Sequence, residues 1–552
     1  MRGGQVFMES LLLHGVDCIF GNPGTTENPL LDRLIDYPQL PYYVALHEGV
    51  AVCAASFYAQ ASGRTAVVNL HVAPGLGNGI GMMYGALKAC SPMIVTAGQQ
   101  DTRMRLDNPL LSHDLVAMAA PVTKFSAEPR SADEMGPLLR RAFKIANEPP
   151  CGPVFIALPV DVMEQETRIS ASIAGELHAP GASQEAINAA LALLLKAKSP
   201  CLVVGDDASR CGALDELVRL AELCGARVHH EGLRAQVCFP SRHPNYRGRT
   251  PFEAAAVQKL LSPNDLIVLI GGPFFEDVWH DPTPHIPNGA KVLHLENNRS
   301  RLAHSLPVDL GIVGDLKSTL GALTSALGNA ESSYQKAAQS RNQSLLAEHG
   351  EITARATAAL EKLWDTRPMA PMRAVHEIAR ALPDNAILVD ESITASLDVA
   401  HQFNERRAGD YFGGRGGGIG QGLAGAIGVQ VAQPERRVVA ISGDGSAMYS
   451  IQALWSAAHH QLPILFIILS NREYRVLKHN LDIYRSRFDI RSNKPYPHMD
   501  LTNPTLGFPQ LAQGMGVDGE TIEDPEDIGP AMTRALATNA PYLLEIVVSG
   551  KQ

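Results

Sequence analysis

The sequence predicts an α/β protein made of three doubly wound domains, each with a parallel sheet covered by helices. Three observations lead to this prediction. The chain has 552 residues, too many for one hydrophobic core and enough for roughly three or four ordinary domains. Short apolar runs that end at Gly, Asn or Asp alternate with helical stretches along the chain. Polar stretches without such runs divide it into domains at residues 1–180, 185–330 and 365–552.

The expected strands are short apolar runs of the kind buried inside a parallel sheet. In the first domain they are residues 17–20, 66–70, 93–96 and 154–158. In the second domain they are residues 201–204, 266–270, 292–295 and 311–313. In the third domain they are residues 387–389, 438–441, 463–469 and 543–548. Between the domains, we expect a linker over residues 162–183 and a polar helical stretch over residues 328–367.

Composition excludes several classes of partner. The net charge is −10, from 47 basic and 57 acidic residues without a long basic run, so the chain lacks the electrostatic footprint of a nucleic-acid-binding protein. It has neither an apolar signal segment at Met1 nor a long uncharged apolar run, which predicts a cytoplasmic protein without membrane contact. Its 8 cysteines form no CxxC pair, so we expect reduced, mostly buried thiols. Small metabolites are the expected partners.

The most informative motif follows the expected strand at residues 438–441. Gly443, Asp444 and Gly445 end this strand, and Asn471 ends the next one 27 positions after Asp444. In a βαβ unit the two strand ends meet in the crevice where open α/β sheets bind ligands. Carboxylate, amide and main-chain carbonyl oxygens are the ligands that Mg²⁺ takes together with phosphate oxygens. The pattern therefore predicts a metal and diphosphate site, whereas a Gly-Asp-Gly turn alone would be equally compatible with an ordinary loop.

This motif resembles the thiamine diphosphate fingerprint of the pyruvate decarboxylase and acetohydroxyacid synthase superfamily. The resemblance implies that Mg²⁺ or Ca²⁺ is held by Asp444, Asn471 and the main-chain carbonyl of Glu473. It also implies cofactor contacts from residues around these ligands, namely Gly443, Gly445, Ser446 and Tyr474. The family usually has a second Asn where this chain has Ser470, a change that leaves the ligand in place. The three domains would then be the pyrimidine-binding domain, the middle domain and the diphosphate-binding and Mg-binding domain.

Glu48 resembles the carboxylate that activates the cofactor in this family. It lies in the sequence Leu46, His47, Glu48, Gly49, in an otherwise apolar stretch. The resemblance implies that Glu48 hydrogen-bonds the pyrimidine ring and, through it, removes the thiazolium proton. The alternative is an acidic residue at a helix N-terminus, which is a common structural feature. The flanking residues 58–63 also match the family and favour the catalytic interpretation.

Two further clusters, at residues 20–27 and 69–75, resemble the benzoylformate decarboxylases. In that family a Ser and a His bind the substrate carboxylate and move protons, and these positions correspond to Thr25 and His71. A single His at a strand end is more often structural than catalytic, but its sequence context favours catalysis here. The family's second catalytic His corresponds to Val278, and His280, two positions later, is a substitute. His113 is another candidate for the substrate pocket.

A glycine-rich segment at residues 416–420 precedes an Ala/Gly-rich helix. By resemblance, Ile419 supports the bent form of the cofactor, Gly418 contacts the pyrimidine, and the strand end with Glu391 and Ser392 contacts the diphosphate. Arg475 and Asn480, after the metal motif, favour a substrate that is smaller or more polar than an aromatic keto acid.

Three functions other than decarboxylation are compatible with parts of the sequence. Residues 420–425 satisfy GxGxxG, but residues 410–415 are not the apolar strand that a nicotinamide-binding loop requires. A non-catalytic binding or regulatory subunit could keep the fold, although the presence of Glu48, Asp444 and Asn471 disfavours it. Carboligation of the acetohydroxyacid synthase type shares its first steps with decarboxylation. We therefore expect a thiamine diphosphate-dependent 2-oxoacid decarboxylase that also joins aldehydes, active as a homodimer at least and by resemblance as a homotetramer.

Overall fold

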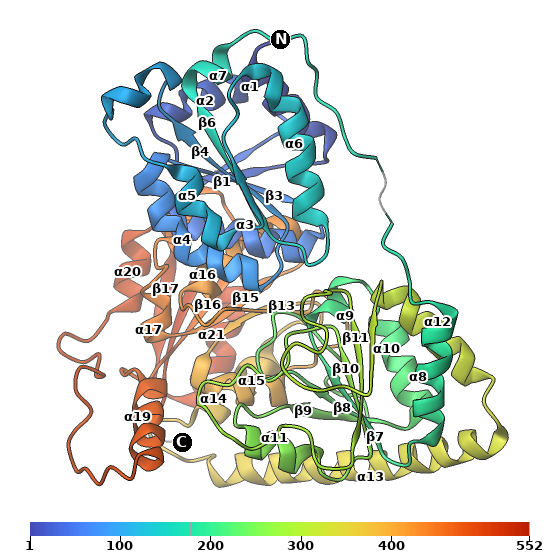
Figure 1. Ribbon diagram of the computed structural model, residues 1–552. Helices are drawn as coiled ribbons and strands as arrows, with labels where there is room; N and C mark the ends of the chain where they lie inside the picture. The colour runs from blue at the N-terminus through green and yellow to red at the C-terminus, as the bar shows by residue number, and fades with distance from the viewer. Residues whose placement is uncertain (176–177, 551–552) are drawn as a thin grey trace. The chain divides into compact units, whose positions relative to one another are not determined.

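A computed structural model describes residues 1–175 and 178–550 of the chain, so residues 176–177 of the expected linker and residues 551–552 of the expected third domain lie outside the described residues. Three six-stranded sheets with interleaved helices make up the fold (Figure 1), which confirms the predicted fold class. Contacts divide the described chain into two compact units. The first contains residues 1–175, 364–399 and 413–550, and the second contains residues 178–363 and 400–412.

The first sheet has the strand order β2-β1-β3-β4-β6-β5, and all of its pairings are parallel. Its strands are β1 (Ile19–Gly21), β2 (Tyr42–Val44), β3 (Ala66–Leu70), β4 (Met93–Gln99), β5 (Phe125–Ala127) and β6 (Pro153–Pro159). The α-helices are α1 (Gly3–Leu13), α2 (Asn28–Leu34), α3 (Glu48–Ser62), α4 (Val72–Lys88), α5 (Leu115–Ala119), α6 (Ala132–Asn147) and α7 (Val160–Glu164). Short 3₁₀ turns are η1 (Thr25–Glu27), η2 (Thr102–Asp107) and η3 (Ala120–Val122).

Helices cover both faces of this sheet because neighbouring strand residues point to opposite sides. Ile19 of β1 packs into one core with Phe7 of α1 and Phe143 of α6. The next residue, Phe20, faces the other side, where its ring lies 5.6 Å from that of Tyr58 on α3. Strands buried on both faces explain why the sequence shows continuous apolar runs and not an alternating pattern.

The third sheet has the order β14-β13-β15-β16-β18-β17. Its strands are β13 (Ile387–Glu391), β14 (Tyr411–Gly413), β15 (Val438–Gly443), β16 (Leu465–Ser470), β17 (Asp518–Ile522) and β18 (Tyr542–Val547). Its helices are α14 (Pro371–Ala381), η4 (Ile393–Ala395), α15 (Ser396–Gln402), α16 (Gln421–Ala432), α17 (Asp444–Ala447), α18 (Ala453–His459), α19 (Arg475–Arg487), α20 (Phe508–Gly514) and α21 (Pro525–Ala537).

Within the first unit, α16 packs directly against α3 of the first sheet's domain. Glycines allow this close approach. A Cβ at Gly428 would lie 1.8 Å from the carbonyl oxygen of Ala54, and a Cβ at Gly425 would lie 2.7 Å from the ring of Phe57. The Ala/Gly-rich composition of α16 is thus a packing requirement, because any larger side chain would separate the two helices.

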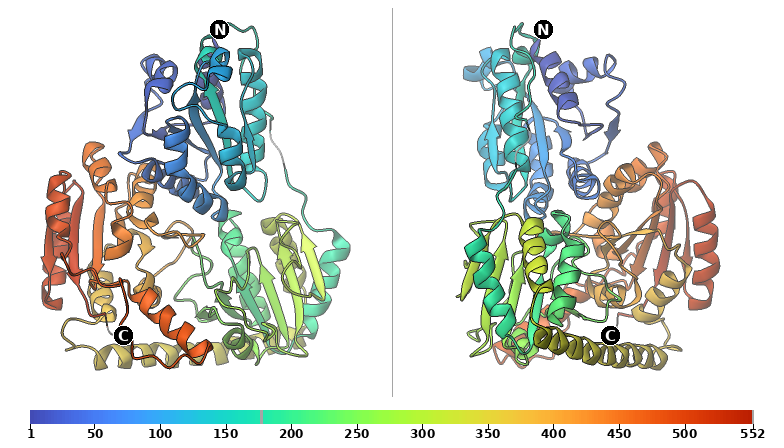
Figure 2. Two further views of the ribbon diagram at one scale, coloured as in Figure 1. Left: turned by 60° about the vertical axis from the view of Figure 1, so that its left-hand side comes forward. Right: turned by 90° about the vertical axis from the view of Figure 1, so that its right-hand side faces the viewer.

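The second unit contains the remaining sheet, with the order β12-β11-β10-β7-β8-β9 and parallel pairings. Its strands are β7 (Pro200–Val204), β8 (Arg227–His230), β9 (Tyr246–Arg249), β10 (Leu266–Ile270), β11 (Lys291–Glu296) and β12 (Leu310–Val313). Its helices are α8 (Gln184–Lys196), α9 (Asp206–Arg210), α10 (Leu214–Cys224), α11 (Ala254–Leu261), α12 (Leu316–Gly328) and α13 (Ser332–Lys362). Figure 2 shows α13 as one long continuous helix.

In the first and third sheets, the strand order reverses next to the first strand. These reversals lie between β1 and β3 and between β13 and β15. Crevices at the carboxyl ends of such strand pairs are the usual ligand sites of open α/β sheets. Of the 8 cysteines, 6 are buried. No helix within residues 1–175 and 178–550 is long and apolar enough to cross a lipid bilayer.

Candidate active site

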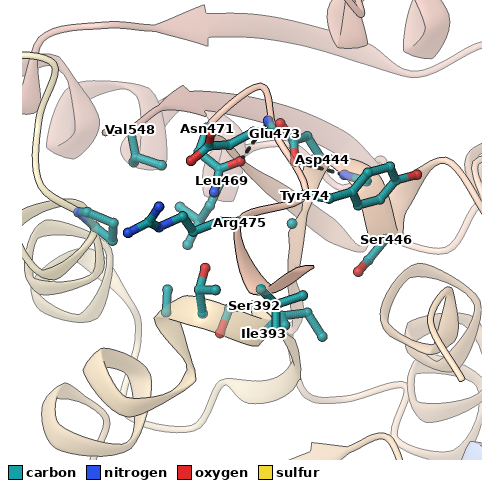
Figure 3. Close-up of a pocket in the computed structure, with 16 residues that line it drawn as sticks. Ser392, Ile393, Asp444, Ser446, Leu469, Asn471, Glu473, Tyr474, Arg475 and Val548 are labelled. Atoms are coloured by element: carbon teal, nitrogen blue, oxygen red, sulfur yellow. Dashed lines mark hydrogen bonds between the residues drawn. The ribbon is translucent and has the colours of Figure 1, made fainter. Parts of the chain in front are cut away.

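A pocket opens at the carboxyl edge of the third sheet, where β13, β15 and β16 end (Figure 3). It is lined by most of the residues that the sequence assigns to the metal and the diphosphate, namely Ser392, Gly443, Asp444, Gly445, Ser446, Asn471, Glu473 and Tyr474. Arg475, Thr394 and Val548 also line it. The fold therefore brings together residues that are far apart in the chain, because the ends of adjacent parallel strands meet at one edge of the sheet.

Asp444 is the buried carboxylate of this pocket. Its Oδ1 atom accepts a hydrogen bond from the N–H of Gly445 at 2.8 Å, and its Oδ2 atom accepts one from the N–H of Arg472 at 2.6 Å. Arg472 has a φ of 59°, a left-handed conformation within the turn that follows β16. Burial raises the pKa of Asp444 to about 6, against the lowering effect of these bonds. Within the described chain Asp444 makes no ion pair, so a cation bound in the pocket would neutralise its charge.

Asn471 and Glu473 lie in the turn after β16. The amide oxygen of Asn471 accepts the N–H of Glu473 at 3.1 Å. The Glu473 side chain forms an ion pair with Lys478, whose Nζ also lies 2.6 Å from a carboxylate oxygen of Asp500. Because its carboxylate is engaged there, Glu473 can serve the pocket through its main-chain carbonyl. This arrangement fits the ligand set that the family resemblance implies.

The glycines beside Asp444 leave room for a ligand. A Cβ at Gly443 would meet no atom within 4 Å, so the pocket is open at this position. At Gly445 a Cβ would lie 2.3 Å from the ring of Tyr474, so only glycine allows this close approach. Oxygen donors around an open space suit Mg²⁺ or Ca²⁺ together with phosphate oxygens. The residues present therefore fit the metal and the diphosphate.

Glu391 does not line this pocket but organises the glycine-rich segment next to it. Its Oε1 atom accepts the N–H groups of Gly420 at 2.7 Å and Gln421 at 2.9 Å, and its Oε2 atom accepts that of Gly422 at 2.9 Å. The carboxylate thus binds the N-terminus of α16. These hydrogen bonds from the start of α16 also fix the segment that precedes the helix. In that segment Gly418 is exposed and Ile419 is half-buried. Ser392, the next residue, lines the pocket.

Glu391→Gln is expected to remove a pH dependence of stability. Burial raises the pKa of Glu391 to about 7 from an ordinary value of 4.5. A carboxyl whose pKa is raised on folding stabilises the fold below its unfolded pKa, and this stabilisation is lost as pH rises through about 7. The expected difference between parent and variant across this window is on the order of 3 kcal/mol. Thermal unfolding of the protein without ligands at several pH values measures it, with Glu435→Gln at an exposed position as the control. Equal pH dependence in parent and Glu391→Gln would contradict it.

At the first sheet, Glu48 lies at the carboxyl end of the strands as the first residue of α3. It is 7% exposed. The side-chain amide of Asn22 donates to its Oε1 atom at 3.3 Å, and that of Asn78 donates to its Oε2 atom at 3.0 Å. A Cβ at Gly75 would lie 3.0 Å from Glu48 Oε1 and 3.3 Å from the Cβ of His71. Glu48 and His71 are therefore close neighbours on either side of this glycine.

His71 is oriented by a residue to which the sequence analysis assigns no role. Its Nδ1 atom lies 2.7 Å from Oε2 of Glu27, which is 2% exposed. Glu27 also accepts the N–H groups of Gly24 and Gly98, both at 2.8 Å, and the hydroxyl of Thr26 at 2.9 Å. A carboxylate at Nδ1 keeps the proton there and leaves Nε2 as the atom available to a substrate. In the sequence, Glu27 follows the expected strand at residues 17–20 and is preceded by Gly21 and Gly24.

The remaining predicted substrate residues lie outside these contacts. Thr25 is exposed, and it is Thr26 whose hydroxyl lies 3.4 Å from Nδ1 of His71. His113 is exposed, and its carbonyl oxygen accepts a hydrogen bond from Gln99 at 3.0 Å. His280 lies in the second unit, exposed in the loop between β10 and β11. The roles of Thr25, His113 and His280 stay predictions.

Comparison with known proteins identifies the family. The chain matches the three domains of the thiamine pyrophosphate enzymes: the N-terminal TPP binding domain over residues 1–118, the central domain over residues 187–323 and the C-terminal TPP binding domain over residues 394–546. The matched segments contain Glu48 and His71 of the first strand-end site and Asp444 and Asn471 of the second.

Relatives match along the whole chain. A benzoylformate decarboxylase of Pseudomonas aeruginosa is 33% identical over 543 residues, which cover 98% of this chain and 97% of that protein. A probable acetolactate synthase large subunit of Methanocaldococcus jannaschii is 27% identical over 563 residues, 99% of this chain and 92% of that protein. The solved structure of a thiamine diphosphate-dependent 4-hydroxybenzoylformate decarboxylase of Rhodococcus jostii RHA1 superposes with a TM-score of 0.87 at 30% identity, covering 100% of this chain and 99% of that one. The chain belongs to the thiamine pyrophosphate enzyme family, among its decarboxylases and synthases.

Proposed function

We propose that this protein decarboxylates a 2-oxoacid to an aldehyde without oxidation, with bound thiamine diphosphate and Mg²⁺, and that it can also join aldehydes. One observation carries the proposal. The chain holds a buried carboxylate beside a histidine at one strand end, Glu48 and His71, and a pocket with Asp444 and Asn471 at another. The first pair suits proton transfer, and the second suits a metal and a diphosphate.

Each group in this proposal has a defined task. Asp444, Asn471 and the carbonyl of Glu473 would hold the metal, and Gly443, Gly445, Ser446, Ser392 and Tyr474 would surround the diphosphate. When bound, thiamine diphosphate supplies the carbon nucleophile and stabilises the charge left after CO₂ departs. Glu48 would exchange a proton with the pyrimidine ring, and Gly418 and Ile419 lie in the segment that would support that ring. When His71 is protonated on both nitrogens, its Nε2–H would donate to the substrate carboxylate and could deliver that proton, while Glu27 at Nδ1 stabilises the positive charge.

His71→Ala is expected to lower kcat/KM by on the order of 10²-fold or more, because a positioned acid or base contributes about that much. Steady-state kinetics with the best 2-oxoacid measures this effect. His304→Ala, at an exposed histidine of the second unit, is the matched control. Parental kcat/KM in His71→Ala would refute the assignment of the first-domain site to decarboxylation.

A second kinetic experiment tests His280. If it replaces the family residue that corresponds to Val278, His280→Ala should slow release of the aldehyde. Single-turnover kinetics would then show fast CO₂ formation and late aldehyde. Parental kinetics in both phases would remove His280 from the site.

The choice between decarboxylase and synthase depends on the fate of the product. A panel of 2-oxoacids, assayed for CO₂ release with and without an acceptor aldehyde, separates the two. Free aldehyde as the main product supports the decarboxylase, which the 33% identical relative favours. An acyloin or acetohydroxyacid as the main product supports the alternative, which the acetolactate synthase relative favours. Absence of turnover with bound cofactor would favour a binding or regulatory role.

We further propose that the active form is at least a homodimer, with a homotetramer as the expected assembly. In such an assembly Glu48 of one chain would face the diphosphate pocket of another, so each site needs two chains. Light scattering of the protein with cofactor determines the subunit number. A cytoplasmic location remains part of this proposal.

A further inference from the structure

Arg475 is a pocket residue to which neither the metal site nor the proton-transfer pair assigns a task. It is the first residue of α19, is half-buried, and lines the same pocket as Asp444 and Asn471. In Figure 3 its guanidinium lies between Val548 and the loop with Ser392, on the side of the pocket where β13 and β18 end. A positively charged side chain at this position can bind an anionic ligand in the pocket.

The guanidinium of Arg475 has no hydrogen-bonded or ion-paired partner among the described residues. Among residues 1–175 and 178–550, Arg475 donates no hydrogen bond and forms no ion pair. Other cations of α19 are paired: Lys478 lies between Glu473 and Asp500, and Arg485 lies 3.7 Å from Asp482. An arginine presents up to five N–H donors in a fixed plane, so an unpaired one that faces a pocket is available to a ligand.

The location of this charge on the helix points to an anion. α19 begins at Arg475, and its first turn contains no acidic residue. A cation at a helix N-terminus is unfavourable, because the helix dipole is positive at that end. A negative ligand in the pocket would be attracted by both the helix dipole and the guanidinium. It would offset the repulsion between Arg475 and the positive end of the dipole of α19.

The charges of the pocket identify the class of anion. Asp444 is its buried carboxylate, and Glu473 is already neutralised by Lys478. A divalent metal would balance Asp444 and only part of a diphosphate, which carries several negative charges. The planar guanidinium matches phosphate oxygens with two parallel hydrogen bonds.

We propose that Arg475 binds the diphosphate of the cofactor and supplies the positive charge that the metal leaves unbalanced. This inference rests on the proposed function, because it requires thiamine diphosphate in the pocket. It adds to the family's metal and main-chain contacts a side-chain cation from this chain. A substrate carboxylate is the competing ligand, and the experiment below distinguishes the two.

Calorimetric titrations at a fixed Mg²⁺ concentration test the proposal with three ligands: thiamine diphosphate, inorganic diphosphate and thiamine. Arg475→Gln is expected to weaken the first two by on the order of 10- to 100-fold, as expected for the loss of hydrogen bonds to a charged group. Thiamine, which has no phosphate, should bind parent and variant equally. Arg475→Lys should recover part of the affinity, because it restores the charge without the planar fork.

Arg487→Gln is the matched control, since Arg487 is exposed at the other end of the same helix and does not line the pocket. Circular dichroism of each variant checks that α19 and the fold are kept. Parental affinity of Arg475→Gln for thiamine diphosphate would overturn the inference, and a raised KM for the 2-oxoacid alone would show that Arg475 binds the substrate carboxylate instead. If the parent protein itself fails to bind thiamine diphosphate, the proposed function is overturned and the inference falls with it.

Discussion

Asp444→Ala is expected to abolish binding of thiamine diphosphate together with Mg²⁺. The metal would lose its charged protein ligand, and the N–H groups of Gly445 and Arg472 would lose their acceptor. Because even indirect supports of a metal site typically contribute 10- to 100-fold in affinity, the loss of a direct ligand should exceed about 100-fold. Titration calorimetry with thiamine diphosphate, at a saturating Mg²⁺ concentration for the parent, measures this loss.

Asp518→Ala is a suitable control because Asp518 is an exposed carboxylate on the edge strand β17 of the same sheet. It should bind the cofactor as the parent does. If Asp444→Ala also keeps parental affinity, the pocket at the ends of β15 and β16 is not the metal site. Titration of the parent and of Asp444→Ala with Mg²⁺ and inorganic diphosphate then shows whether the metal and the diphosphate bind at this pocket at all.

Glu48→Gln is expected to bind the cofactor but to lose nearly all turnover. The amide has the shape of the carboxylate and can still contact Asn22 or Asn78, so the N-terminus of α3 should keep its structure. It cannot exchange a proton with the pyrimidine ring, and loss of a general acid or base lowers rates by about 10²- to 10⁴-fold. Hydrogen–deuterium exchange at the thiazolium carbon, followed by NMR, reports this step directly.

The control for this variant is Glu361→Gln, at an exposed position near the end of α13. Equal exchange rates in Glu48→Gln and the parent would show that Glu48 is not the activating carboxylate. Loss of cofactor binding in Glu48→Gln would mean that the side chain is needed for the structure of the site rather than for proton transfer.

The central strands were predictable because their sequence signal is local. Residues 66–70 and 266–270 coincide with β3 and β10, since strands buried on both faces appear as uninterrupted apolar runs. The strands that the sequence analysis did not identify are β2, β5, β8, β9, β14 and β17. All except β8 lie at the edges of their sheets. Edge strands are short and often partly exposed, so their apolar signal is weak.

In the candidate site, too, local motifs predicted some residues but not their partners. Asp444, Asn471 and Glu48 could be found because their motifs combine a strand end with glycines and polar residues at defined spacing. The partner of His71 could not be found from spacing, because Glu27 lies 44 positions away and reaches it only through the pairing of β1 with β3. Likewise, Glu391 reaches the N–H groups of Gly420 to Gly422 only because β13 ends beneath the start of α16.

The sequence by itself determined the α/β class and the family, and it offered candidate residues for metal and cofactor, because apolar runs and strand-end motifs are local properties of the chain. Only the tertiary structure decided which side chains remain free for chemistry. It placed Thr26 rather than Thr25 beside His71 and engaged the carboxylates of Glu473 and Glu391 elsewhere. Partners of this kind depend on contacts between distant segments, and such contacts are set by strand order and helix packing, which no short stretch of sequence encodes.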